Sequence, residues 1–190
     1  MKNIYIFLVS ILSVGCSTPL RLPKDMSSGN SILLPFKVDT VIIVDLRQDT
    51  TSKNLTLPLF AVKQREWTVR PSLEADLQQD IVHLIKQGSY LNGIPAVVTL
   101  SIQDGYYKIA GNAKKVGEYT EFDCVINFAP KESSRQWKSS AKSYNNYEGL
   151  INATEKHAKQ MYHITAINGV YTALKQAEKI FDTSESKDVR

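Results

Sequence analysis

The chain has 190 residues, of which 43% are hydrophobic and 22% are charged, and its formal net charge is +4. This balance excludes a wholly disordered chain, because disordered segments are poor in apolar residues and rich in charge. The net charge is too small to predict a nucleic-acid-binding protein, which normally carries a concentrated basic face. The length fits one domain with a hydrophobic core and is short for two.

The first fifteen residues predict an export signal. Lys2 supplies a positive charge, residues 4–12 form an apolar run, and small residues lie directly before Cys16. The run falls well short of the roughly 20 residues that a membrane-spanning helix needs. The residues before Cys16 resemble the lipid-attachment sequence of bacterial lipoproteins, and this favours acylation of Cys16 as the mature N-terminus. Cleavage by the ordinary signal peptidase is the alternative.

Lipid attachment would determine where the protein is located. Each buried methylene adds about 0.8 kcal/mol, so several acyl chains on one cysteine give a stable membrane anchor. Ser17 follows the cysteine, and the absence of Asp there resembles sorting to the outer membrane. We therefore expect an outer-membrane protein, lipid-anchored, whose domain faces the periplasm. Cys124 would then be the single thiol, and its alternating apolar neighbours predict a buried core side chain.

The remaining chain divides into a linker, one domain and a tail. Residues 16–37 contain three prolines and a Ser-Ser-Gly-Asn run, which predict a lipidated linker without helix or strand. The domain is predicted to span residues 38–181. Residues 182–190 read as a polar tail.

The domain is predicted to begin with a strand over residues 40–49. The β-branched run at residues 41–44 is typical of a strand buried on both faces. Residues 55–62 form a possible second strand, and Pro58 within it suits only a sheet edge.

Residues 72–87 predict an amphipathic helix. Ser72 is a suitable N-cap, and Gly88 follows as a stop signal. Apolar residues recur at helical spacing, so this helix should lie on one face of a sheet: Leu73, Leu77, Ile81, Leu84 and Ile85.

Three strands with alternating polarity are predicted next, over residues 98–110, 119–128 and 135–144. The first contains the turn signal Asp104-Gly105, after which the extended chain is expected to continue. In the other two, one set of alternate residues should face inward: Phe122, Cys124, Ile126 and Phe128, then Trp137 and Ala141.

A long helix is predicted over residues 147–181, with a bend or a close packing contact at Asn168-Gly169. The order of elements predicts an α+β fold. We expect a mixed, mostly antiparallel sheet of four to five strands with two helices packed on one face.

This layout resembles a known family. The lipid-attachment sequence, a first strand that runs into Asp45-Leu46-Arg47, the helix that ends at Gly88 and residues 136–140 before the closing helix resemble YajG-type envelope lipoproteins. The arrangement is also similar to transport-auxiliary lipoproteins and to the amino-terminal domain of TolB-like proteins. The resemblance implies a non-catalytic module that docks on envelope partners.

Two groups of residues are candidate binding sites. Asp45, Arg47 and Asp49 alternate along the first strand, so their side chains should project from one side. They would form either a polar recognition spot or a surface ion network. The second group contains four tyrosines expected in loops or at strand ends, where they would either form an exposed interface or saccharide surface or close the ends of the core: Tyr106, Tyr107, Tyr144 and Tyr147.

The sequence shows no catalytic pattern such as a nucleophile elbow, a glycine-rich phosphate loop or Cys-x-x-Cys. The spacing of His83, His157 and His163 does not match a metal motif. Glu118 and Glu121 are expected to be solvated. We therefore expect no enzyme activity, no catalytic residue, no metal and no cofactor.

The favoured hypothesis is an accessory or binding module of the cell envelope. Its partners would be the membrane, through the lipid, and an envelope protein complex or cell-wall component, but no nucleic acid. The alternatives are an envelope hydrolase, and a soluble exported carrier of an apolar ligand. The oligomeric state is left open.

Overall fold

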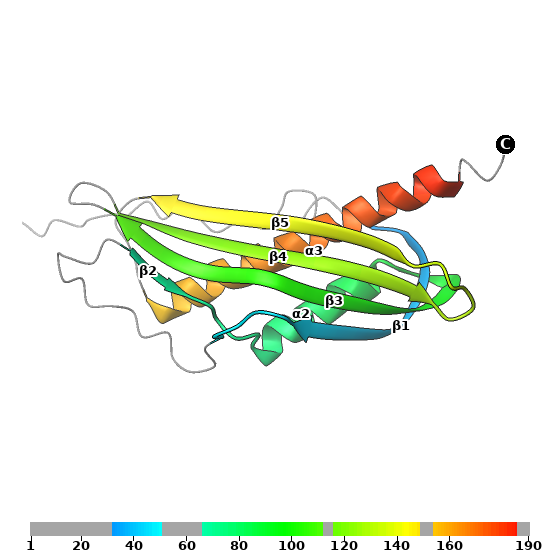
Figure 1. Cartoon of the computed structure of the whole chain (residues 1–190), viewed down its shortest axis with the longest axis horizontal. Helices are drawn as coiled ribbons and strands as arrows, with labels where there is room; N and C mark the ends of the chain where they lie inside the picture. The colour runs from blue at the N-terminus through cyan, green and yellow to red at the C-terminus, as the bar shows by residue number, and fades with distance from the viewer. Residues whose placement is uncertain (1–31, 51–65, 112–115, 149–153, 186–190) are drawn as a thin grey trace, which may run out of the picture.

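The computed structural model describes residues 32–50, 66–111, 116–148 and 154–185. The export signal, Cys16 and the possible strand at 55–62 lie outside these residues. The described chain forms one mixed sheet of five strands, with two helices on one face (Figure 1). The predicted α+β fold is confirmed.

The sheet is built around one long strand. β3 (Ser89–Gly111) pairs antiparallel with β4 (Val116–Pro130), which pairs antiparallel with β5 (Trp137–Glu148). Two strands share the other edge of β3. β1 (Leu34–Asp45) pairs parallel with its first half, and β2 (Glu66–Val69) pairs antiparallel with its second half.

The Asp104-Gly105 turn signal produces a bulge and not a reversal of the chain. The register between β3 and β4 shifts between Ile102 and Asp104, and pairing then continues to Gly111. Because β4 spans both halves of β3, the strand stays extended through residues that would favour a turn on their own. On the other edge of β3, the bulge lies between the part that pairs with β1 and the part that pairs with β2.

The first strand begins earlier than predicted and lies at the edge of the sheet. Residues 32–37, which the sequence analysis assigned to the linker, contribute Ile32, Leu34 and Phe36 to the core. A proline is tolerated here because an edge strand does not need every N–H for pairing. The prediction that β1 is buried on both faces is wrong, since Ile42 is 45% exposed on the face away from the helices.

Helix α2 (Ala75–Gln87) carries the predicted apolar stripe, and its four buried residues pack onto the sheet: Leu77, Ile81, Leu84 and Ile85. Gly88 follows its last residue, as predicted. The predicted start is wrong, because Glu74 occupies the N-cap and makes no side-chain cap hydrogen bond, whereas Ser72 lies outside the helix.

Helix α3 (Glu155–Glu185) covers the rest of the same face. Its predicted start is also wrong, since Tyr147 belongs to β5. The predicted close contact is confirmed: a Cβ atom on Gly169 would lie 2.9 Å from Phe122 Cδ1 and 2.9 Å from Ser143 Oγ. The helix continues past residue 181 into the predicted tail. Neither α2 nor α3, the helices of the described chain, has the length and apolar character needed to cross a membrane.

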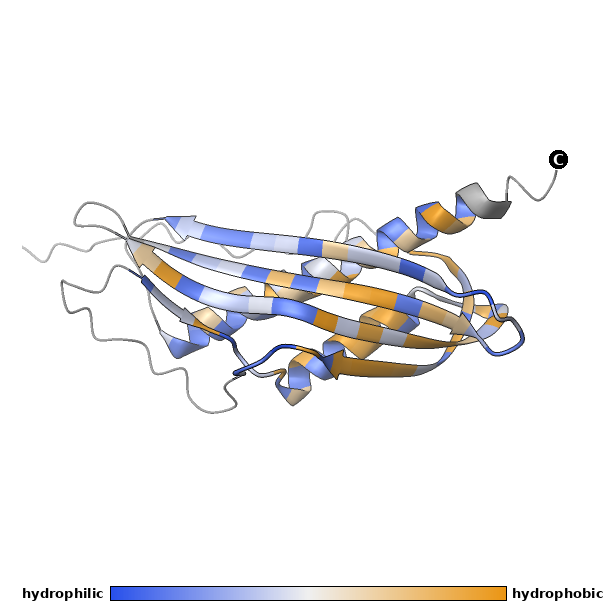
Figure 2. Cartoon of the chain, viewed as in Figure 1, coloured by the Kyte–Doolittle hydropathy of each residue, from blue (hydrophilic) through white to orange (hydrophobic). Residues whose placement is uncertain are grey.

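The core lies between the sheet and the helices. The predicted inward set of β4 is confirmed, because Phe122, Cys124, Ile126 and Phe128 are all 0% exposed. A cluster of rings fills one end: Phe36, Phe128, Trp137 and Phe181. Figure 2 shows that apolar residues gather in β1 and the adjoining parts of β3 and β4, whereas β5 is mostly polar. The other face of the sheet is not covered by α2 or α3, and we call it the open face.

Candidate functional site

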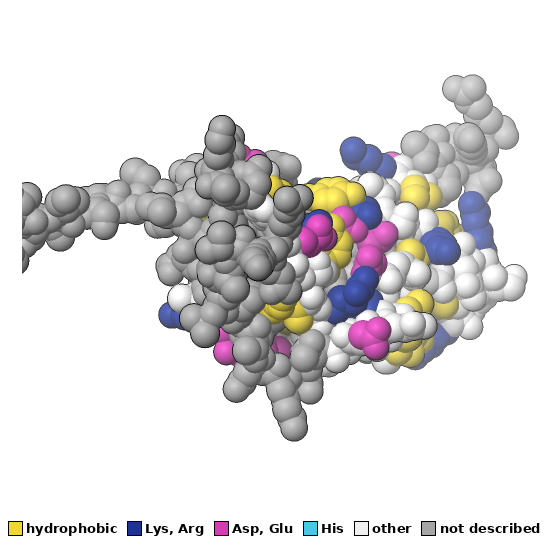
Figure 3. Space-filling view, turned by 60° about the vertical axis from the view of Figure 1, so that its left-hand side comes forward, with side chains coloured by type: hydrophobic (Ala, Val, Ile, Leu, Met, Phe, Trp, Pro, Cys, Tyr) yellow, Lys and Arg dark blue, Asp and Glu magenta, His cyan; other side chains and the backbone are white. Residues whose placement is uncertain are grey.

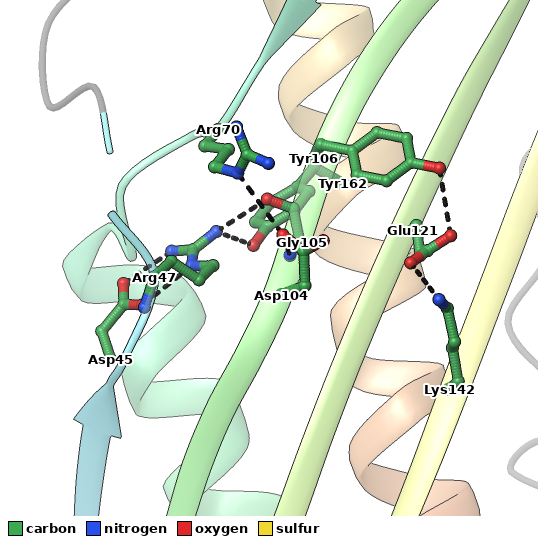
Figure 4. Close-up of polar contacts among 9 residues, drawn as sticks. All are labelled: Asp45, Arg47, Arg70, Asp104, Gly105, Tyr106, Glu121, Lys142 and Tyr162. Atoms are coloured by element: carbon green, nitrogen blue, oxygen red, sulfur yellow. Dashed lines mark hydrogen bonds and ion pairs between the residues drawn. The ribbon is translucent and has the colours of Figure 1, made fainter. Parts of the chain in front are cut away.

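At the bulge, a short stretch of the edge of β3 is paired with neither β1 nor β2. β1 ends with Asp45 opposite Ile102, and β2 pairs from Val69 opposite Tyr107. Arg47 reaches into this gap with a side chain that is 0% exposed, and its Nη1 donates to the carbonyl oxygen of Gly105 at 3.2 Å (Figure 4). A guanidinium therefore supplies a donor where a neighbouring strand would otherwise supply a backbone N–H.

The remaining donors of Arg47 join three elements. Its Nε lies 2.8 Å from Asp45 Oδ1, and its Nη2 lies 2.6 Å from Asp45 Oδ2, which is the forked geometry of a strong ion pair. Nη1 also donates to the hydroxyl of Tyr162 in α3 at 2.5 Å. One buried side chain thus connects the end of β1, the bulge of β3 and the long helix.

The charges in this network stay ionised. Desolvation opposes ionisation of Asp45, but the hydrogen bonds and charge of Arg47 outweigh it and lower the pKa of Asp45. Desolvation also opposes the charge on Arg47, and Asp45 together with Tyr162 raises the pKa of Arg47. Burial raises the pKa of Tyr162, which therefore stays protonated. The pair is a fixed structural charge.

Gly105 is needed at the bulge because there is no space for a side chain. A Cβ atom there would lie 2.7 Å from the hydroxyl of Tyr162 and 3.3 Å from Arg47 Nη1. The preceding Asp104 accepts the N–H of Gly105 at 2.8 Å and pairs with Arg70 at 3.4 Å. The bulge is thus held from both sides.

A second polar cluster lies on the open face beside the bulge. Glu121 of β4 accepts a hydrogen bond from the hydroxyl of Tyr106 at 3.0 Å and forms an ion pair with Lys142 of β5 at 2.5 Å (Figure 4). Lys142 Nζ lies 5.5 Å from the ring centre of Tyr144, which is 65% exposed. We call these four residues the open-face cluster. Figure 3 shows acidic and basic side chains gathered together on one face of the molecule.

The open-face cluster has a defined protonation state. Burial and the bond to Glu121 raise the pKa of Tyr106, which keeps its hydroxyl protonated. The bond to Glu121 raises the pKa of Lys142, which stays cationic. The carboxylate and the ammonium therefore neutralise each other beside an exposed aromatic ring. Such a surface can bind a partner through stacking and hydrogen bonds.

The structure divides the first predicted site. Asp45 and Arg47 are paired, but Arg47 is buried, so the interpretation of this group as a surface ion network is wrong for Arg47. Asp49 lies outside the pair, exposed, with a φ of 59° in the left-handed region that Asp tolerates better than most residues. The ion pair is positioned to hold the fold together.

The four tyrosines do not form one surface. Tyr106 and Tyr107 are neighbours in a strand, so they point to opposite faces. Tyr107 lies within β3 and is buried, so its predicted place in a loop or at a strand end is wrong, and its burial fits the alternative that these tyrosines close the core. Tyr147 is partly buried in the same small core. Only Tyr106 and Tyr144 lie on the open face, where Glu121 and Lys142 join them.

Sequence reasoning missed two buried carboxylates, since Glu118 and Glu121 were both expected to be solvated and Glu121 is only 6% exposed. The side chain of Glu118 is 0% exposed, and its Oε2 lies 2.8 Å from His157 Nε2 of α3. Desolvation raises the pKa of Glu118, and the charge of His157 opposes this rise. The burial of Glu118 could have been predicted from strand alternation, because Glu118 lies on the same side of β4 as Thr120 and Phe122.

The other histidines make isolated contacts. His163 lies 2.9 Å from Asp80, and His83 lies 2.8 Å from Gln87. Within the described ranges, no three His, Cys, Asp or Glu side chains gather as they would around a metal ion.

Comparison with known proteins shows a distant structural likeness. No family model matches the chain, and no curated protein matches it. Among solved structures, it is similar to a minor lipoprotein from Acinetobacter baumannii, with 10% sequence identity and a TM-score of 0.42 over 76% of this chain and 94% of that chain. A likeness this distant says nothing about what the chain binds.

Proposed function

We propose that the chain is a bacterial envelope lipoprotein, anchored through Cys16, whose domain binds an envelope partner and catalyses no reaction. In this proposal the anchor lies in the outer membrane and the domain faces the periplasm. The sequence before Cys16 supports the anchor. The observation that carries the binding role is the open-face cluster, where an exposed ring lies beside a paired carboxylate and ammonium.

The open-face cluster favours a polar partner that is not strongly charged. Glu121 and Lys142 neutralise each other, so neither is free to attract a partner of one sign. Tyr106 and Tyr144 supply aromatic surface, and tyrosine is common in protein interfaces. A segment of an envelope protein complex or a neutral part of a cell-wall polymer meets these requirements.

Two observations weigh against the alternative functions. A hydrolase at the first strand would use Asp45, but both oxygens of this carboxylate are bound by Arg47. A carrier of an apolar ligand needs space between sheet and helices, and the rings of Phe36, Phe128 and Phe181 are packed against one another there. Both favour a binding role for the open face.

The anchor is tested by fractionation of the full chain. The Cys16→Ser variant should move from the membrane fraction to the soluble fraction, because the attachment atom is lost. Membrane attachment that persists in this variant would contradict the lipid anchor.

The binding role is tested by capture from crosslinked envelopes. The Tyr144→Ala variant should recover its main partner about tenfold less efficiently than the wild-type chain, as expected for an aromatic residue at the centre of an interface. Lys138→Ala is the matched control, since it lies on the same strand, exposed, away from the cluster. Equal recovery by Tyr144→Ala and wild type would overturn this site.

A further inference from the structure

The second half of β1 is an unprotected strand edge. β1 is the terminal strand of the sheet order, so no strand of the described chain lies on its far side. Residues 40–44 read Thr-Val-Ile-Ile-Val and contain no charge and no proline. Ile42 is 45% exposed, and Leu46 just beyond is 54% exposed. Exposed apolar edge strands are sites where another strand can pair.

The first half of the same strand is protected in the usual ways. It contains Pro35 and the charged residues Lys37 and Asp39, and its register with β3 shifts between Val38 and Thr40. Charges, prolines and irregularities of this kind discourage edge pairing. The protection stops at Thr40, where regular pairing with β3 resumes. The contrast within one strand indicates that residues 40–44 are normally covered.

We infer that a second copy of this chain pairs antiparallel with β1, about a two-fold axis that passes through Ile42. This register places Ile42 opposite Ile42, Val41 opposite Ile43 and Thr40 opposite Val44. All five uncharged residues are then paired, and opposite side chains share a face of the sheet, as antiparallel pairing requires. The symmetric arrangement uses the same patch on both copies, which is the commonest form of dimer.

The charges next to this block are compatible with the pairing. The register places Asp39 of one copy near Asp45 of the other. Each carboxylate already has a cation in its own copy: Asp39 lies 2.7 Å from Lys131, and Asp45 lies 2.6 Å from Arg47. Their mutual repulsion is therefore reduced, and the block between them decides the pairing.

Helix α2 supplies the additional contact that a stable dimer needs. Five paired residues extend over only about 17 Å, which is short for the roughly 800 Å² that each partner buries in a typical stable interface. An open groove of about 540 Å³ lies between β1 and α2, with Val41, Ile43 and Val82 among its lining residues. The axis brings the two grooves together on one side of the joined sheet.

The side of α2 that lines the groove also fits this two-fold arrangement. Leu34 N donates to Gly88 O, so α2 runs opposite to β1 and the two α2 helices would be antiparallel. Lys86 lines the groove in the last turn of α2, and it would face the first turn of the other copy, where Gln78 and Gln79 line the same groove. The ammonium can donate a hydrogen bond to a side-chain amide oxygen there, so no like charges meet across the axis.

The pairing is tested by disulfide crosslinking of the full chain in isolated envelopes. Residues opposite each other in antiparallel strands have Cα atoms about 4.5–5.5 Å apart, which is within disulfide reach. Under a mild oxidant, the Ile42→Cys variant should run mainly as a disulfide-linked dimer on a non-reducing gel. The wild-type chain should run as a monomer on the same gel, since its Cys124 is 0% exposed and cannot form the crosslink.

Single cysteines elsewhere on the strand test the register. In Thr40→Cys, the Cα atoms of the two cysteines, one in each copy, would be roughly 14 Å apart. In Leu46→Cys they would be farther apart, so neither variant should crosslink. The double variant Thr40→Cys with Val44→Cys should crosslink again. Ile42→Cys protein that reacts with a maleimide but stays monomeric would overturn the inference, and so would equal crosslinking of all three single variants.

Discussion

At the scale of single residues, two buried charges behave differently because their partners differ. Arg47 has a carboxylate, a carbonyl and a hydroxyl within hydrogen-bond distance, so its burial is compensated. Glu118 has His157 as its ion-pair partner in the described part of the chain, and both of its oxygens are buried without a well-aligned hydrogen bond. Burial without full compensation disfavours the ionised carboxylate. The cost of ionising Glu118 should therefore appear in the pH dependence of stability.

We predict that Glu118→Gln makes the protein less sensitive to rising pH. A carboxyl whose pKa is raised in the folded state gives stability that is complete below its unfolded pKa, about 4.3, and is lost as pH rises through the folded pKa. Glutamine has the same shape and never ionises. The stability of the variant relative to wild type should therefore increase between pH 4 and pH 7.5, because only the wild-type carboxyl loses its proton in this interval.

Urea unfolding of both proteins at the two pH values measures this difference. Glu132→Gln is a suitable control, because Glu132 is exposed in the turn after β4 and should leave the pH dependence unchanged. A relative stability of Glu118→Gln that stays constant or decreases with pH would contradict the raised pKa.

At the scale of elements, alternation predicted the strands well, whereas local boundary signals succeeded at Gly88 and failed at Ser72. The inward parity of Phe122, Cys124 and Phe128 follows from the sequence because one face of β4 is buried along the whole strand. Ser72 and Asp104-Gly105 are signals for a cap and a turn, and both were overridden by pairing with distant strands or by packing. Local preferences of about 1 kcal/mol are small compared with the burial of a whole strand.

Helix α3 provides a test in which local preference and packing have opposite signs. Alanine is favoured over glycine in a helix by about 1 kcal/mol, so propensity alone predicts that Gly169→Ala stabilises. Its methyl group would lie 2.9 Å from Phe122 Cδ1 and Ser143 Oγ, and overpacking of this kind costs about 1–3 kcal/mol. We expect Gly169→Ala to be about 1 kcal/mol less stable in urea unfolding.

A matched change on the solvent side of the same helix separates the two effects. Thr172 is exposed, so Thr172→Ala should gain from helix propensity without meeting the sheet, and its stability should stay within about 0.5 kcal/mol of wild type or rise. If Gly169→Ala were more stable than wild type, the close approach of α3 to the sheet would be disproved.

At the scale of the whole molecule, the candidate site depends on contacts that the sequence does not show. The i, i+2 spacing of Asp45 and Arg47 suggested their proximity, and the structure pairs them. The place of Arg47 at the edge of β3 could be predicted only from the fact that β1 and β2 share this edge. Both strands pair with residues at least 38 positions away in the sequence. The open-face cluster likewise joins residues from three strands, so sequence spacing gives no sign of it.

The two cysteines allow a prediction about the whole mature protein. Cys124 is 0% exposed, and burial raises its pKa to about 12, so its thiol should not react in the folded state. A lipidated Cys16 has no free thiol. The mature protein should therefore show no thiol that reacts with Ellman's reagent under native conditions, and one after denaturation in urea. Cleavage by the ordinary signal peptidase would instead leave Cys16 free, giving one reactive thiol in the native protein and two in urea. The native count thus reports on lipidation, and the increase on denaturation reports on burial of Cys124.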